Sequence, residues 1–153
     1  MSMANLNGER KHILLVEDCE DDWELMAFKL REYKLAFARG FEEGLRLARW
    51  QLFDLFILDN WLPDGSGVGL CRLIRKFDPR TPILFYSGAS YDRDIVEALR
   101  SGAQAYLVKP VELDDLERAV AGLTRSEENF RHLDRRKTLT CWAGSLRLLR
   151  RVD

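Results

Sequence analysis

Apolar residues are concentrated in five short runs that no polar residue interrupts. They occupy residues 13–16, 35–38, 55–58, 83–86 and 106–108. Because consecutive residues of a strand point to opposite faces of a sheet, an unbroken apolar run indicates a strand that is covered on both faces. The pattern therefore predicts five strands of a parallel sheet packed between two layers of helices.

Each run is followed by a segment whose apolar residues have the i, i+3, i+4, i+7 spacing of one helix face. These segments predict helices that include residues 23–30, 41–48, 70–77, 95–102 and 116–123. Ser66 is placed to cap the third helix, and Gly40 and Gly102 mark connections. Strict alternation of strand and helix predicts right-handed crossovers in an open α/β sheet, with the ligand site at the carboxyl ends of the strands.

The glycine-rich loops that bind nucleotides are absent from the sequence. No G-x-G-x-x-G follows the first predicted strand, and no G-x-x-x-x-G-K-[ST] occurs anywhere, which argues against dinucleotide or NTP binding. The three cysteines are widely spaced without a C-x-x-C pair, and the two histidines lie far from each other. This spacing argues against a disulfide framework and against a zinc site.

Length and charge narrow the class of protein further. The 153 residues, of which 46% are hydrophobic, suffice for one compact domain. The 24 basic and 25 acidic residues give a net charge of −1, so bulk charge does not favour binding to DNA or to anionic lipid. No apolar run reaches the roughly 18 residues that span a bilayer, and residues 1–11 do not resemble a signal peptide. We therefore expect a soluble, cytoplasmic protein without direct DNA binding or membrane association.

Polar residues that can bind a cation or a phosphate follow four of the predicted strands. Glu17 and Asp18 come directly after the first strand, Asp59 after the third, Ser87 after the fourth and Lys109 after the fifth. Because the carboxyl ends of parallel strands lie at one rim, we expect these side chains to converge. Three carboxylates raise one another's pKa unless a cation binds them, and Mg²⁺ prefers oxygen ligands. The sequence therefore predicts a Mg²⁺ site beside an ammonium and a hydroxyl group.

Four motifs in this order resemble the receiver domain of two-component response regulators. They are ILLVEDCEDD at residues 13–22, DLFILDNWLPDGSG at 54–67, PILFYSGA at 82–89 and GAQAYLVKP at 102–110. The resemblance covers about residues 11–123, which we expect to form the receiver domain. It implies a flavodoxin-like sheet in the strand order 2-1-3-4-5, which the patterning alone leaves open.

The resemblance implies that Asp59 is the phosphoacceptor. Its carboxylate would attack the phosphoryl group carried by a sensor histidine kinase or a phosphotransfer protein. Lys109 would neutralise the phosphoryl oxygens, and Ser87 would donate a hydrogen bond to them. Such a domain acts in phosphorelay signal transduction and is not an enzyme, although its phosphorylation is self-catalysed and its aspartyl phosphate hydrolyses slowly.

The resemblance also implies the metal ligands and the switch residues. Mg²⁺ would be held by Glu17, Asp18, Asp59 and the backbone carbonyl of Trp61, with Asp18 the more direct ligand of the acidic pair. Tyr106 matches an aromatic switch position, which turns inward when the Ser87 counterpart moves towards the phosphate. A tyrosine that is merely half-buried on an edge strand is the alternative for this position. Two residues differ from the commonest pattern of the receiver family: Ser87 stands where threonine is frequent, and Gly88 where alanine is usual.

The ends of the chain lie outside the resemblance. We expect residues 1–10 to be disordered and residues 124–153, with eight basic and four acidic residues, to form a basic, partly helical extension. Helical spacing relates four of its apolar residues, Leu139, Trp142, Leu146 and Leu149. This stripe either docks on a partner or a second copy, or folds back over its own receiver. Binding of this basic amphipathic stretch to a membrane surface is a third, less favoured alternative. Thirty residues are too few for a DNA-binding effector with its own core, which predicts a single-domain regulator.

Phosphorylation is expected to act through protein contacts on one face. The helix at 95–102, the strand at 106–108 and the helix at 116–123 would form this face and contact a downstream partner or a second copy. The rival function is a small Mg²⁺-dependent phosphatase with Asp59 as nucleophile, but the general acid that it needs two residues later is Trp61 here. A flavin-binding protein of similar sheet order is a third alternative, and it lacks support because residues 17–22 replace the hydroxyl-rich phosphate loop.

Overall fold

The computed structural model describes residues 9–125. Five parallel strands form one sheet in the order β2-β1-β3-β6-β7. Their bounds are β1 His12–Val16, β2 Lys34–Ala38, β3 Leu55–Leu58, β6 Ile83–Ser87 and β7 Ala105–Val108. Numbered along the chain without the short strands described below, this order is 2-1-3-4-5, which confirms the flavodoxin-like sheet.

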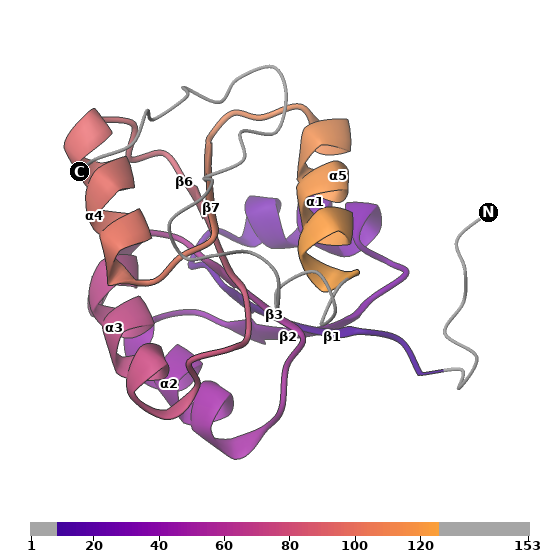
Figure 1. Cartoon of the computed structure of the whole chain (residues 1–153). Helices are drawn as coiled ribbons and strands as arrows, with labels where there is room; N and C mark the ends of the chain where they lie inside the picture. Colours follow the sequence, from indigo (N-terminus) through magenta and orange to yellow (C-terminus); the bar gives the residue numbers. More distant parts are fainter. Residues whose placement is uncertain (1–8, 126–153) are drawn as a thin grey trace.

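In the described part of the chain, five helices cover the two faces of the sheet (Figure 1). They are α1 Glu20–Lys29, α2 Phe41–Trp50, α3 Gly67–Phe77, α4 Asp92–Ser101 and α5 Leu113–Thr124. The core on one face contains residues of α2, α3 and α4, and the core on the other contains residues of α1 and α5. Within residues 9–125, none of these helices is long and apolar enough to cross a membrane.

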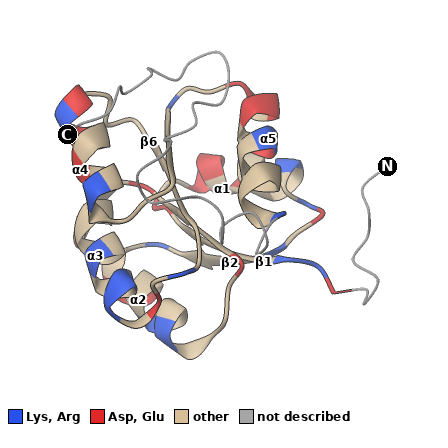
Figure 2. Cartoon of the chain, viewed as in Figure 1, with Lys and Arg blue, Asp and Glu red and all other residues tan. Residues whose placement is uncertain are grey.

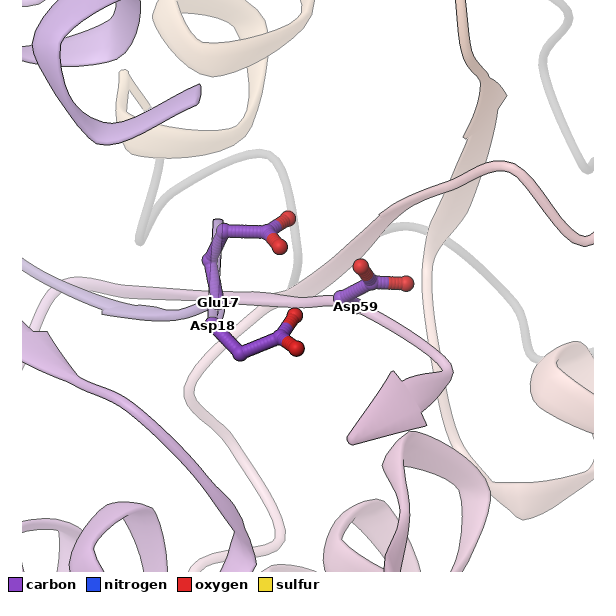
Figure 3. Close-up of side chains that lie close together, drawn as sticks. All are labelled: Glu17, Asp18 and Asp59. Atoms are coloured by element: carbon purple, nitrogen blue, oxygen red, sulfur yellow. The ribbon is translucent and has the colours of Figure 1, made fainter. Parts of the chain in front are cut away.

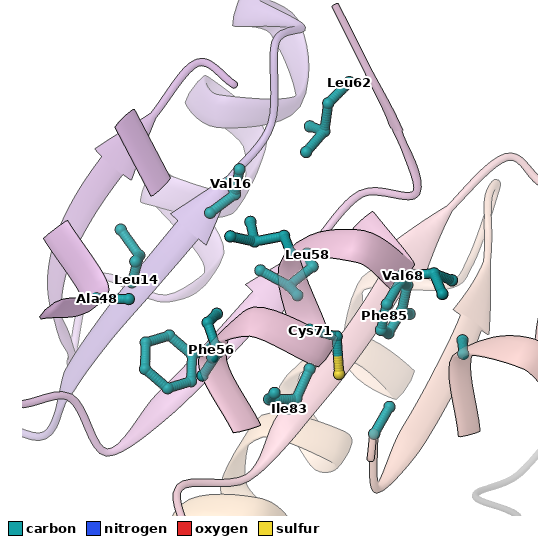
Figure 4. Packing of buried hydrophobic residues seen from close by; sticks show 14 of the residues in the cluster. Leu14, Val16, Ala48, Phe56, Leu58, Leu62, Val68, Cys71, Ile83 and Phe85 are labelled. Atoms are coloured by element: carbon teal, nitrogen blue, oxygen red, sulfur yellow. The ribbon is translucent and has the colours of Figure 1, made fainter. Parts of the chain in front are cut away.

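Both faces of the central strands are buried, as the unbroken apolar runs predicted. Leu14 and Val16 of β1 pack in the same core as residues of α2 and α3 (Figure 4). Ile13 and Leu15 face the other core. All four residues of β3 are buried. Fully burying a large apolar side chain contributes about 1.5–3 kcal/mol, so these strands anchor the polar residues that follow them.

One feature of the helix ends agrees with the sequence, and one differs. The Ser66 hydroxyl accepts a hydrogen bond from the backbone N–H of Gly69 at 3.0 Å and caps α3, as predicted. The apolar spacing in α4 runs to Gly102, but the helix ends at Ser101. Gly102 has φ 119°, a left-handed conformation that glycine adopts without steric cost. A backbone signal at the helix end therefore prevails over the side-chain spacing.

A small hairpin follows Asp59 and was not predicted. Its strands are β4 Trp61–Leu62 and β5 Gly65–Ser66, which pair antiparallel. In the turn, Asp64 accepts hydrogen bonds from the backbone N–H groups of Phe41 at 2.6 Å and Glu42 at 3.1 Å. These bonds lower the pKa of Asp64. The carboxylate therefore supplies the N-terminal cap of α2 from a distant part of the chain.

Arg75 connects α3 with the turn after α4. Its guanidinium donates to the carbonyl of Gly102 at 2.9 and 3.1 Å, to Asp78 O at 2.9 Å and to Thr81 O at 2.8 Å. A further bond at 3.0 Å reaches the side-chain oxygen of Gln104. A half-buried cation thus satisfies several carbonyl groups at the amino-terminal edge of the sheet.

Candidate functional site

Three carboxylates meet at the carboxyl ends of β1 and β3. Glu17 and Asp18 follow β1, and Asp59 follows β3, which is paired with β1. One oxygen from each carboxylate lies within 4.8 Å of the others (Figure 3). The backbone N–H of Asp59 donates to Val16 O at 3.0 Å, which continues the strand pairing to the site. The structure thus brings together the acidic residues that the sequence placed at this rim.

Burial distinguishes two of these carboxylates, those of Glu17 and Asp59, from ordinary surface acids. Glu17 is 1% and Asp59 7% exposed, whereas Asp18 is exposed. Burial raises the pKa of Glu17 to about 7, with a further increase from the charge of Asp59, and the hydrogen bond from Lys109 opposes the increase only in part. Near neutral pH and in the absence of a divalent cation, the Glu17 carboxyl group is therefore only partly ionised.

Lys109 lies among the carboxylates. Its Nζ donates to Glu17 Oε2 at 2.5 Å, to Asp22 Oδ2 at 2.7 Å and to Asp59 Oδ2 at 3.3 Å. Burial favours the neutral amine, but the hydrogen bonds to Asp22 and Glu17 prevail and raise the pKa of Lys109 above its ordinary value. The side chain is therefore a permanent cation of the site.

Ser87 and Trp61 contact the other oxygen of Asp59. The buried Ser87 hydroxyl donates to Asp59 Oδ1 at 2.7 Å and accepts from the backbone N–H groups of Asn60 and Ala89. The backbone N–H of Trp61 donates to the same Asp59 oxygen at 3.2 Å, while its side chain is 63% exposed. The Asp59 carboxylate is thus oriented by a hydroxyl and an N–H group on one oxygen and by an ammonium on the other.

Tyr106 is buried, although β7 is an edge strand. Its hydroxyl donates to Ala89 O at 2.6 Å, and its ring stacks on Phe85 with 5.6 Å between the ring centroids. Burial raises the pKa of Tyr106 to about 12. The half-buried alternative for this side chain is therefore wrong, and the phenol contacts the segment that directly follows Ser87.

Two residues that contact Lys109 were not assigned a role from the sequence. Asp22 lies in the first turn of α1, and the Tyr86 ring centroid lies 5.0 Å from Lys109 Nζ. Asp22 belongs to the acidic run at residues 17–22, but only the direction of α1 brings it back to the rim. Tyr86 forms part of an apolar strand run, which gave no signal for a contact with a cation.

The raised pKa of Glu17 predicts a pH dependence of stability in the absence of divalent cations. The pKa rises from 4.5 to about 7 on folding, so between these values the folded state binds more protons than the unfolded state. The free energy of unfolding should then fall as pH rises, by roughly 2 kcal/mol between pH 5 and pH 8. Urea denaturation in EDTA measures this slope. The Glu17→Gln variant should have a flatter profile, and equal slopes in the two proteins would contradict the assignment.

The fold is an α/β domain with a cluster of acidic residues at the carboxyl ends of its strands, and comparison with known proteins gives its family. The profile described as "Response regulator receiver domain" matches residues 13–121. The chain belongs to this family. Receiver domains interact with histidine kinases or phosphotransfer proteins and are generally not enzymes.

Curated relatives and solved structures agree with this assignment. The transcriptional regulatory protein AfsQ1 of Streptomyces coelicolor is 38% identical over 120 residues, which cover 76% of this chain and 52% of that protein. This chain thus spans about half the length of such relatives. A two-component response regulator from Clostridium difficile has a TM-score of 0.72 at 30% identity, with 76% of this chain and 97% of that chain covered.

A second solved structure is informative about the site. It is the receiver domain of the sensor histidine kinase PA1611 from Pseudomonas aeruginosa, with a TM-score of 0.71 and 27% identity. The match covers 76% of this chain and 99% of that chain. That structure has a magnesium ion coordinated in its active site cleft.

Proposed function

We propose that this protein is a phosphorylation-dependent signalling receiver in which Asp59 accepts a phosphoryl group in a Mg²⁺-dependent reaction. The observation that carries the proposal is the environment of Asp59. One of its oxygens accepts from Ser87 at 2.7 Å, the other lies 3.3 Å from the Lys109 ammonium, and two further carboxylates lie within 4.8 Å. A phosphorelay partner, either a sensor histidine kinase or a phosphotransfer protein, would supply the group.

The donor set fits Mg²⁺. Glu17, Asp18 and Asp59 carry only oxygen donors, and together they place more negative charge at the rim than the ammonium of Lys109 neutralises. Mg²⁺ binds such sites through a few carboxylates and keeps several waters. The backbone carbonyl of Trp61 is the fourth proposed ligand. When bound, the metal would supply charge neutralisation for the phosphoryl oxygens.

The residues of this chain account for the transfer chemistry. The ionised Asp59 carboxylate attacks the phosphorus atom, an O–P bond forms, and the P–N bond to the donor histidine breaks with its electron pair returning to the imidazole. Lys109 then neutralises phosphoryl oxygens, and the Ser87 hydroxyl turns from the carboxylate to donate to one of them. The result is an aspartyl phosphate.

The proposed readout passes through the contact between Tyr106 and Ala89. Ser87 Oγ accepts a hydrogen bond from the Ala89 N–H, and the Tyr106 hydroxyl donates one to the Ala89 carbonyl. A movement of Ser87 towards a phosphate would therefore displace Ala89 and alter its hydrogen bond with Tyr106. The surface of α4, β7 and α5 would then contact a downstream partner or a second copy.

We infer that residues 11–123 form the receiver unit. Most of the predicted extension at 124–153 lies outside the described residues, as does most of the predicted disordered segment at 1–10.

Phosphoryl uptake from a small donor tests the proposed function directly. The full chain is incubated with acetyl phosphate in Mg²⁺ or in EDTA, and its intact mass is measured over time. We expect a gain of one phosphoryl group in Mg²⁺ and none in EDTA, because the clustered carboxylates repel the anionic donor when no cation neutralises them. Equal uptake in the two buffers would contradict the metal dependence, and release of many phosphates per chain would favour the phosphatase alternative.

A further inference from the structure

We propose that Asp22 is a positioning residue that holds the Lys109 ammonium away from the incoming phosphoryl group, and that it thereby slows phosphoryl uptake while favouring cation binding. The inference rests on the proposed function of Asp59. It concerns a residue on α1, outside the strand ends that carry the other side chains of the site.

The first observation is the distribution of Lys109 contacts. The ammonium lies 2.7 Å from Asp22 Oδ2 but 3.3 Å from Asp59 Oδ2. It is therefore closer to a carboxylate that has no part in the proposed transfer than to the one that does. A phosphoryl group on Asp59 would therefore compete with Asp22 for the Lys109 ammonium.

The second observation is that Lys109 keeps other supports when Asp22 is removed. Its Nζ also contacts Glu17 Oε2 at 2.5 Å, and the face of the Tyr86 ring lies 5.0 Å away, a distance typical of a cation–π interaction. The side chain is only 18% exposed. Loss of the Asp22 charge would thus leave the ammonium shared between Glu17 and Asp59, the two carboxylates that it still contacts.

The third observation is the local charge. Asp22 adds a fourth carboxylate to Glu17, Asp18 and Asp59 around the ammonium of Lys109. Figure 2 shows acidic residues at the start of α1, which includes Asp22, and at the start of the neighbouring helix α5. An added negative charge attracts a divalent cation and repels an anionic phosphodonor. Removing this charge should therefore weaken the binding of a divalent cation and favour the approach of an anionic phosphodonor.

The test compares three variants of the full chain with the wild type. Asp22→Asn keeps the shape of the side chain and removes its charge, whereas Asp22→Glu keeps the charge. Asp21→Asn is the matched control, because it removes the same charge from an exposed position in the same helix turn. Calorimetry measures Mg²⁺ affinity, and intact mass measures the rate of uptake from acetyl phosphate at saturating Mg²⁺.

We expect Asp22→Asn to weaken Mg²⁺ binding and to accelerate uptake, each by about three- to tenfold, the size expected for one partly screened charge. Asp22→Glu should behave like the wild type, and Asp21→Asn should change either quantity less than about twofold. Slower or unchanged uptake in Asp22→Asn, or an equal effect in Asp21→Asn, would overturn the inference alone. A wild-type chain that takes up no phosphoryl group would overturn the proposed function as well.

Discussion

We expect the Asp59→Asn variant to take up no phosphoryl group from acetyl phosphate, although its fold is retained. The amide is uncharged and is a far weaker nucleophile than the carboxylate. Its carbonyl oxygen can still accept from the Ser87 hydroxyl and the Trp61 N–H, which both donate to the same oxygen of Asp59. Removing one of the clustered negative charges also lowers repulsion with Glu17. Intact mass after incubation with Mg²⁺ and acetyl phosphate measures the effect.

Asp54→Asn is a matched control for this experiment. Asp54 precedes β3, whereas Asp59 follows it, so the same charge is lost at the opposite end of one strand. Its carboxylate accepts from the backbone N–H of His12 at 2.7 Å and does not contact the site. This variant should be phosphorylated like the wild type. A stable phosphoryl adduct on Asp59→Asn would show that another residue is the acceptor.

The second large effect is expected on stability, from Arg75→Ala. The substitution removes five hydrogen bonds that a half-buried guanidinium donates to carbonyl and amide oxygens. Hydrogen bonds from charged donors are stronger than neutral ones, and unpaired carbonyls in a partly buried site are costly. We expect the free energy of unfolding to fall by about 2–4 kcal/mol, measured by urea denaturation.

Two further variants test whether the loss of stability in Arg75→Ala comes from the hydrogen bonds of the guanidinium group. Arg72 lies on the same helix and pairs with Glu97 at 3.4 Å, and both side chains are more than half exposed. Arg72→Ala should therefore change stability by less than about 0.5 kcal/mol. Arg75→Lys keeps the charge but cannot reach several carbonyls at once, so it should recover only part of the loss. Full recovery by lysine would show that charge alone stabilises this region.

The sequence predicted the sheet because its strands are buried on both faces. A run such as 55–58 has no polar residue, and all of its side chains are buried. The hairpin after Asp59 gave no comparable signal, since β4 and β5 have only two residues each and one of them is Trp61, which is largely exposed. Strands this short depend on tertiary contacts rather than on an apolar pattern.

The candidate site was predictable where it lies at strand ends. Glu17, Asp59 and Lys109 follow strands whose carboxyl ends share one rim, so their meeting required only the α/β order. Asp22 lies on a helix, and its contact with Lys109 depends on how α1 is oriented, which apolar spacing does not give. The chemical roles of these side chains remain predictions that phosphorylation experiments test.

The cap of α2 by Asp64 has a consequence for how the chain folds. The donors are Phe41 and Glu42, more than twenty residues earlier in the sequence. During synthesis, the first turn of α2 leaves the ribosome before its cap exists, so it stays uncapped until the turn at Asp64 has been made. Folding of this helix start is therefore a non-local event, coupled to the ordering of the segment that carries Trp61.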